Sequence, residues 1–410
     1  MDRPALHGSL ESRQIIPTPQ SCLDACEFGN PTRTSPKVIH RMNQRTTIAF
    51  ATLLVIAASI SSVVAAEAIE DIHIVPKPEK LRGYRGINGD LIQRKDGSLL
   101  FCYTEPGEGG GIVSKTSTDQ GSTWSEPKVI VAQPPSSGPG RYNHPSLLQL
   151  DNGDLLISYN YTTHPAKPYY AMTLYRRSAD QGETWSEQLP MTPYAGYTLV
   201  HNDKLLSLKD GRIIAVAATK KYMPSSHDHN GYVGLTFYSD DQGYSWHPSK
   251  NEVDLYDSRK IEVQEPDAVE LKDGRLLMFA RSYSGYPLKA YSEDRGETWS
   301  KGELIRELKM PYAGLPTVRR IPSTGDLLFI WISGKSKSES GLPLRSVLST
   351  AISQDEGETF VHQRNLVDDP TNDLGYQCIE FLEDGTALIV YHSNDGLHMS
   401  RLNVDWFYGK

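Results

Sequence analysis

The sequence predicts an all-β fold, a six-bladed β-propeller whose blades are four-stranded antiparallel sheets. Two interleaved repeats support this prediction. A Gly-centred turn between two apolar runs occurs six times, and a Ser-x-Asp-x-Gly-x-Thr/Ser-aromatic motif occurs five times. Such regular repetition is typical of radial β architectures, which leave only short and protected strand edges. No window of the sequence shows the apolar period of an amphipathic helix.

The Gly-centred turns define the first hairpin of each blade. Each turn follows a short apolar or alternating run, such as Ser146–Leu150 or Ala268–Leu271, and precedes an apolar strand. A strand, a tight Gly turn and a second strand form a β-hairpin. The six turns fall at Asp96-Gly97, Asn152-Gly153, Asp210-Gly211, Asp273-Gly274, Thr324-Gly325 and Asp384-Gly385.

The Ser-x-Asp motifs close the second hairpin of five blades. Successive copies are 61, 61, 53 and 61 residues apart, and they begin at Ser117, Ser178, Ser239, Ser292 and Ser353. The Asp carboxylate can accept backbone N–H groups across its own turn, and the Gly permits a positive φ. Five copies at regular spacing indicate a structural turn rather than five active sites.

The charge balance argues against a nucleic-acid-binding protein. The 410 residues include 42 Lys and Arg against 50 Asp and Glu, and the formal net charge is −8. Nucleic-acid-binding proteins normally carry a basic face. Hydrophobic residues make up 38% of the chain, which is enough for a core and too many for a disordered chain.

The N-terminal region contains the pattern of an export signal. Residues 42–66 start at Met42, carry Arg45, and continue as an apolar run that ends in small residues. We therefore expect a signal peptide, a secreted or periplasmic protein, and no stable membrane insertion after cleavage. Residues 1–41 are interpreted as an extension upstream of the true start, and residues 67–410 as the propeller. An uncleaved membrane anchor is the alternative, since the run is nearly long enough to span a bilayer.

Two cysteines remain when residues 1–66 are set aside, Cys102 and Cys378, and both lie in apolar, strand-like runs. We expect two buried free thiols, with a single disulfide as the alternative. The sequence has no Cys pair or His cluster with metal-ligand spacing, so we expect no structural zinc and no other metal.

The five Ser-x-Asp motifs resemble the Asp-box (BNR) repeats of the sialidase superfamily, and the resemblance extends from about Tyr84 to the C-terminus. It implies a six-bladed propeller and an exo-α-sialidase-like activity. In that family the nucleophile is a Tyr activated by a Glu, because the carboxylate of sialic acid would repel a carboxylate nucleophile. An Arg cluster binds the substrate carboxylate, and a further acid protonates the leaving oxygen.

Four residues match the family pattern in the expected blades and order. Tyr376 begins the blade-six inner strand, as the nucleophile does, and Glu265 resembles its partner Glu. Arg281 and Arg345 resemble two of the three carboxylate-binding arginines. Arg85 is the candidate for the third, although the Pro that usually follows this Arg is missing.

Blade one departs from the family pattern, because the acid/base Asp is absent from the loop Pro106–Gly111. Glu105, Glu108 and Asp90 are the candidate replacements. His144 and His201 precede inner strands in the same register, and each is a further candidate for an acid/base or a substrate contact.

The resemblance thus implies a retaining glycoside hydrolase that needs no cofactor and acts on a glycan with a terminal sialic acid or a related carboxylated sugar. Two alternatives remain open. One is a hydrolase or lyase on another acidic glycan, uronic or sulfated, which the departures in blade one favour. The other is a glycan-binding propeller without catalysis. The sequence does not define the oligomeric state.

Overall fold

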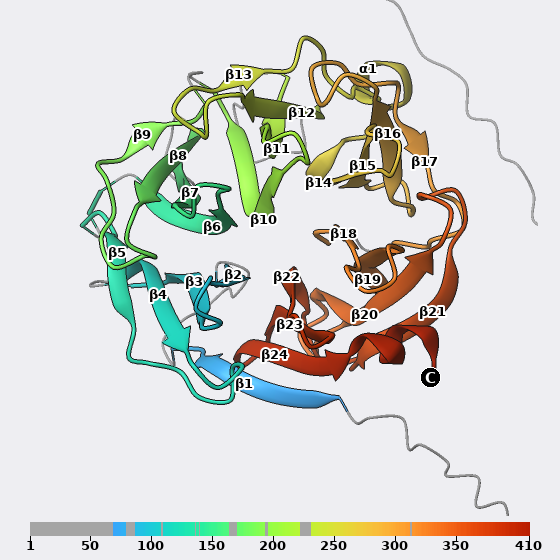
Figure 1. The fold of residues 1–410 in the computed structure, drawn as a ribbon. Coiled ribbons are helices and arrows are strands. Elements are labelled where there is room, and N and C mark those ends of the chain that lie inside the picture. Colours follow the sequence, from blue (N-terminus) through green and yellow to red (C-terminus); the bar gives the residue numbers. More distant parts are fainter. Residues whose placement is uncertain are drawn as a thin grey trace, which may run out of the picture. The chain divides into compact units, whose positions relative to one another are not determined.

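The computed structural model describes residues 69–78, 87–107, 110–135, 137–138, 140–163, 170–192, 196–221, 231–311 and 314–410. The strands of these residues form six four-stranded antiparallel sheets arranged as a ring (Figure 1). The predicted six-bladed β-propeller is therefore confirmed. The proposed signal peptide lies outside the described residues. In the part of the chain that is described, no helix is long and apolar enough to cross a membrane.

The first five blades each use four consecutive strands, ordered outward from the centre of the ring. Blade one contains β2 (Gly89–Gln93), β3 (Leu99–Glu105), β4 (Gly111–Ser117) and β5 (Lys128–Ala132). Blade two contains β6 (Arg141–Gln149), β7 (Leu155–Thr162), β8 (Ala171–Ser178) and β9 (Leu189–Pro190). Blade three contains β10 (Thr198–Ser207), β11 (Ile213–Lys220), β12 (Tyr232–Ser239) and β13 (His247–Pro248).

The next two blades repeat this order. Blade four contains β14 (Gln264–Glu270), β15 (Leu276–Arg281), β16 (Leu288–Ser292) and β17 (Glu303–Leu304). Blade five contains β18 (Thr317–Arg320), β19 (Leu327–Lys337), β20 (Pro343–Ser353) and β21 (Val361–Asp368). The helices in the described ranges are one short α-helix, α1 (Tyr256–Arg259), and one 3₁₀-helix, η1 (Val404–Tyr408).

The sixth blade closes the ring with strands from both ends of the described chain. It contains β22 (Gly375–Phe381), β23 (Thr386–Ser393) and β24 (Gly396–Asn403). Its outermost strand is β1 (Glu70–Pro76), which pairs antiparallel with β24 (Figure 1). This closure joins residues far apart in the sequence, and the repeat pattern did not predict it.

Each blade has two distinct ends. The Gly turns join first to second strands, and the Ser-x-Asp turns join third to fourth strands, so in an antiparallel sheet both lie at the same end. We call this the turn end. The opposite end, where the inner strands β2, β6, β10, β14, β18 and β22 begin, is called the mouth end.

The turn end has the hydrogen bonds that the motif predicts. In the first motif, Asp119 accepts from the backbone N–H of Thr123 at 2.9 Å and from its hydroxyl at 2.6 Å. Ser117 accepts from the N–H of Gly121 at 2.9 Å, and Gly121 has a φ of 86°. The carboxylates of Asp180, Asp241, Asp294 and Asp355 accept the same pair of bonds. These aspartates are thus used by their own turns.

The core consists of apolar clusters between neighbouring blades. Phe279 of blade four packs edge-on against Phe329 of blade five, with ring centroids 4.9 Å apart. Cys102 and Cys378 lie in two such clusters and are buried free thiols, as predicted. The ring is therefore held by apolar packing between sheets rather than by a disulfide.

Candidate active site

The inner strands of four blades are irregular at the mouth end. Their pairing with the second strand shifts register, which indicates a β-bulge in each of β6, β10, β14 and β22. Each bulge contains a non-glycine residue with positive φ: His144 (54°), Asp203 (59°), Glu265 (45°) and Tyr376 (50°). A bulge turns a side chain out of the regular alternation of a strand, and positive φ is costly for such residues. Three of these four residues are site candidates from the sequence.

Tyr376 and Glu265 meet across the ring, although they come from blades six and four. The Tyr376 hydroxyl donates to Oε1 of Glu265 at 3.4 Å. The other carboxylate oxygen, Oε2, lies 2.7 Å from Nη1 of Arg281. Tyr376 is half-buried and Glu265 is buried. The pairing of phenol and carboxylate that the family resemblance implies is therefore present.

Glu265 is held in its charged form. Burial raises the pKa of its carboxyl, but the charges of Arg281 and Arg345, together with His201 when that ring is protonated in acid, lower the pKa to about 2. A carboxylate at this position can accept a proton or a hydrogen bond, and it cannot donate one near neutral pH.

One arginine lies against each member of this pair. Arg281 ends β15, bonds to Glu265, and also contacts the hydroxyl of Tyr283. The guanidinium of Arg345, in β20, lies 5.4 Å from the ring centroid of Tyr376. Both arginines are buried, so water screens their positive charges only weakly.

Two histidines complete the group. The ring centroid of His144 lies 5.3 Å from that of Tyr376, and the His201 ring lies 6.5 Å from it. Nε2 of His201 is 3.9 Å from Oε1 of Glu265. Burial lowers the pKa of His201 to about 4, and it lowers the pKa of His144 well below its ordinary value. Both rings are therefore neutral at pH 7.

The other described candidates, Asp90 and Glu105, make their contacts with residues outside this group. Asp90 is buried, and its carboxylate accepts from the backbone N–H groups of Leu91 at 2.8 Å and Leu147 at 2.7 Å. It therefore links blade one to blade two. Glu105 ends β3 and interacts with the hydroxyl of Tyr103. Arg85 and Glu108 lie outside the described residues.

Sequence reasoning did not predict the role of Asn202, which holds the Tyr376 bulge from across the ring. Its buried side-chain amide donates to the backbone carbonyl of Tyr376 at 2.9 Å and to that of Gly89 at 3.1 Å. One amide of blade three thus contacts the inner strands of blades six and one. His392 was also missed, and its ring centroid lies 5.4 Å from that of Tyr376. A hydrogen bond between distant blades leaves no local signal in the sequence.

A buried ionic network connects the inner strands of blades three, four and five. Nζ of Lys204 lies 3.1 Å from Oδ2 of Asp267, and Nη1 of Arg319 lies 2.8 Å from the same oxygen. Arg319 also contacts the carboxylate of Asp203. Buried charges need such partners, and breaking one pair is strongly destabilising. The network connects strands that carry residues of the site.

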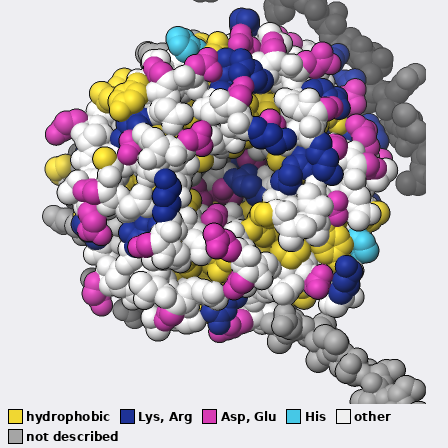
Figure 2. Space-filling view, in the orientation of Figure 1, with side chains coloured by type: hydrophobic (Ala, Val, Ile, Leu, Met, Phe, Trp, Pro, Cys, Tyr) yellow, Lys and Arg dark blue, Asp and Glu magenta, His cyan; other side chains and the backbone are white. Residues whose placement is uncertain are grey.

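In Figure 2 the centre of the ring is hollowed, and basic and acidic side chains are visible in the hollow.

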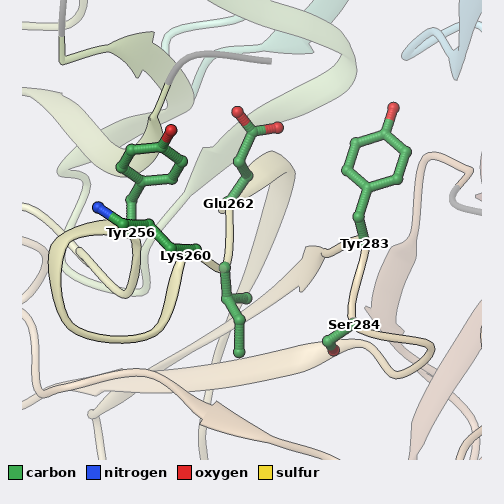
Figure 3. A pocket seen from close by; sticks show the side chains of 6 residues that line it. Tyr256, Lys260, Glu262, Tyr283 and Ser284 are labelled. Carbon is green, nitrogen blue, oxygen red and sulfur yellow. The ribbon is translucent and has the colours of Figure 1, made fainter. Parts of the chain in front are cut away.

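A pocket of about 390 Å³ lies beside Arg281, because Tyr283 borders the pocket and contacts that arginine. Its lining combines aromatic, acidic and basic side chains: Tyr256, Lys260, Ile261, Glu262, Tyr283 and Ser284 (Figure 3). Such a mixture of aromatic faces and polar tips suits a sugar better than an apolar ligand.

A six-bladed ring with Asp-box turns and a Tyr–Glu–Arg group at its mouth defines a propeller of the sialidase superfamily. The model of the BNR repeat-like domain family matches residues 104–389, and the chain belongs to this family.

Individual relatives share less than a quarter of their residues with this chain. A sialidase of Micromonospora viridifaciens is 24% identical, over 92% of this chain and 62% of the relative, so the chain spans under two thirds of that protein. A structure of a protein of unknown function from Dyadobacter fermentans has a TM-score of 0.62, with 22% identity over 82% of this chain and 98% of the other. The NanB sialidase of Streptococcus pneumoniae has a TM-score of 0.60, with 14% identity over 81% and 70%. At these identities the structural likeness concerns the fold.

Proposed function

We propose that this protein is an exo-α-sialidase-like glycoside hydrolase that releases a terminal sialic acid, or a related carboxylated sugar, from glycans with retention of configuration. The observation that carries the proposal is the bond between the Tyr376 hydroxyl and the Glu265 carboxylate, flanked by Arg281 and Arg345. The sialidase names of the relatives support it.

In this mechanism Tyr376 attacks the anomeric carbon and gives its proton to Glu265 while the glycosidic bond breaks and an acid protonates the leaving oxygen. Water then hydrolyses the bond between the sugar and Tyr376, which restores the enzyme. A neutral phenol approaches a carboxylated centre without the repulsion that a carboxylate nucleophile would meet. The guanidinium groups stabilise negative charge as it develops on the phenol oxygen. When the substrate carboxylate binds Arg281 and Arg345, it offsets the charges that lower the pKa of Glu265, so the base becomes stronger as the substrate arrives.

Arg85 is proposed as the third arginine of the carboxylate clamp. The acid that protonates the leaving oxygen is proposed to be one of Glu105, Glu108, His144 and His201. Of these, His144 lies against Tyr376 and His201 lies against Glu265. Asp90 is the weakest candidate, because both of its oxygens already accept hydrogen bonds, Oδ1 from Leu91 of its own strand and Oδ2 from Ser146 and Leu147 of blade two. We also propose that residues 42–66 direct export and are removed.

The neutral histidines favour a second candidate function, a lyase on a uronic acid glycan. In β-elimination a base removes the proton beside a carboxylate whose charge is neutralised by a cation, and the glycosidic oxygen on the next carbon leaves and takes up a proton. Neutral His144 or His201 beside Tyr376 supplies a base, and Arg345 supplies the cation. This reaction leaves a new double bond in the product, whereas hydrolysis does not.

Turnover of a fluorogenic sialoside by the wild type and Tyr376→Phe tests the proposal. We expect turnover by the wild type, its loss in Tyr376→Phe, and normal turnover in the matched control Tyr244→Phe, whose ring is 66% exposed at the turn end. A wild type that leaves sialosides intact but gives an ultraviolet-absorbing product from uronic glycans supports the lyase. Glycan binding without either product supports the non-catalytic alternative.

A further inference from the structure

A cluster of potential metal ligands lies at the seam that closes the propeller. His73 belongs to β1, His398 belongs to β24, and Asp395 lies in the turn that joins β23 to β24. One ligand atom from each of the three residues lies within 4.8 Å of the others. The cluster thus contains one residue from the N-terminal strand and two from the C-terminal hairpin. It is at the periphery of blade six and is separate from the Tyr376 group.

The strand pairing places the two imidazoles together. His73 and His398 are direct partners in the antiparallel pairing of β1 with β24. Their rings are stacked, with centroids 4.5 Å apart and an interplanar angle of 14°. Directly opposed residues in antiparallel strands keep their side chains on the same face of the sheet. Both rings therefore reach the same side of the seam as Asp395.

Each ring nitrogen of His398 contacts a carboxylate. Its Nδ1 lies 3.0 Å from Oδ2 of Asp71, and its Nε2 lies 3.0 Å from Oδ1 of Asp395. Asp71 is itself held, because the hydroxyl of Tyr391 donates to Oδ1 at 3.0 Å. A metal-bound histidine usually donates its second ring N–H to a carboxylate, which fixes the tautomer and the ring plane. Asp71 provides that acceptor and leaves Nε2 directed toward Asp395.

The donor set indicates the class of metal. Two imidazole nitrogens and one carboxylate oxygen suit a first-row transition metal such as Zn²⁺ rather than Ca²⁺ or Mg²⁺, which prefer oxygen ligands. Three protein ligands leave at least one position for water. His73 and Asp395 are exposed, so both can move the short distance that coordination requires.

We propose that His73, Asp395 and His398 form a Zn²⁺ site that ties β1 to the β23–β24 hairpin and so stabilises the closed ring. The metal binds the folded seam and not the separated strands, so its binding free energy adds to the stability of the fold. The site does not depend on the proposed glycosidase activity, and either proposal can fail without the other.

The test measures Zn²⁺ binding and thermal unfolding of EDTA-treated protein in a buffer without chelators. Isothermal titration gives the number of Zn²⁺ ions bound by the wild type, His73→Ala and Asp395→Asn. We expect each variant to bind one Zn²⁺ fewer than the wild type. At a free Zn²⁺ concentration 100-fold above Kd, the Tm of the wild type should rise by roughly 4 °C, and this shift should be lost in both variants.

His247→Ala is the matched control, because His247 is exposed on β13 and is not part of the cluster. This variant should keep the full number of bound ions and the full Tm shift. Equal Zn²⁺ binding and equal Tm shifts in the wild type and His73→Ala would overturn the proposal. A wild type that binds no Zn²⁺ would overturn it as well, and the cluster would then be a hydrogen-bonded ion pair only.

Discussion

Acidic residues at the two ends of the blades have different roles, in structural turns at one end and in the candidate site at the other. At the turn end, five aspartates repeat the same local hydrogen bonds; four of them are exposed and Asp294 is half-buried. At the mouth end, the carboxylates of Asp203 and Glu265 are buried, lie in β-bulges, and differ from blade to blade. Residues that repeat from blade to blade therefore serve the fold, and residues that break the repeat mark the candidate site. We therefore expect substitutions at the mouth end to lower activity, and substitutions at the turn end to lower stability without lowering activity.

The largest effect is expected at Glu265. Glu265→Gln keeps the shape of the side chain but removes the proposed proton acceptor, so kcat should fall by about 10²–10⁴-fold. It also leaves Arg281 without its buried counter-charge, and the free energy of unfolding should fall by about 3–5 kcal/mol. Steady-state kinetics and thermal unfolding measure the two losses separately. In Tyr376→Phe the Glu265–Arg281 pair remains, so activity should be lost with little change in Tm. Similar destabilisation of both variants would contradict this division of roles.

A smaller effect is expected at Asn202, which positions Tyr376 without entering the chemistry. Asn202→Ala removes the bonds to the carbonyls of Tyr376 and Gly89, and we expect kcat to fall on the order of 10-fold with KM nearly unchanged. Asn202→Asp, which cannot donate from its side chain when ionised, should not restore the rate, whereas Asn202→Gln should do so in part. If all three variants lose stability and keep kcat, the residue serves only the fold.

At the turn end, substitutions should lower stability and leave activity unchanged. Asp294→Ala removes the two bonds to Thr298, and we expect a loss of about 1 kcal/mol in the free energy of unfolding, because hydrogen bonds in a partly exposed turn add little net stability. The turnover number should not change. Glu339→Ala, an exposed acidic residue outside these turns, is the matched control and should change neither quantity. A large fall in kcat for Asp294→Ala would show that the two ends are coupled.

The smallest effect is a pH dependence of stability. Hydrogen bonds from Thr123 and Ser117 lower the pKa of Asp119 to about 2, and the corresponding bonds from Thr184 and Ser178 lower the pKa of Asp180 to about 2. A lowered pKa in the folded state stabilises it above the unfolded value of about 3.9, and this contribution is lost as the pH falls toward 2. Tm should therefore decrease between pH 4 and pH 2, less steeply in the variant with Asp119→Asn and Asp180→Asn. Parallel Tm curves for the two proteins would contradict the assignment.

The fold was predictable because its signals are local. The residues that bond within a Ser-x-Asp turn, such as Ser117, Asp119 and Thr123, lie within seven positions of one another. The closure by β1 was not predictable from the repeats, because the partner of His73 is His398 at the other end of the described chain. For the same reason a search for metal-ligand spacing in the sequence gave no candidate.

The site was predictable in part. The family pattern located Tyr376, Glu265, Arg281 and Arg345, and the structure brings these four together. The bulges that orient them depend on contacts between blades, such as the bond from Asn202 to the Tyr376 carbonyl, and a linear motif does not record such contacts. Blade one departs from the pattern, so the acid that serves the leaving group was not identified from the sequence.

The central claim is that Tyr376 becomes covalently attached to a carboxylated sugar. Its most direct test is incubation with a 2,3-difluorinated sialic acid, which slows breakdown of the glycosyl-enzyme, followed by mass spectrometry of the intact protein and its peptides. We predict one added sugar on the peptide that contains Tyr376, and none in Tyr376→Phe. A protein that hydrolyses sialosides yet carries the label on another residue, or carries no label, would contradict the claim.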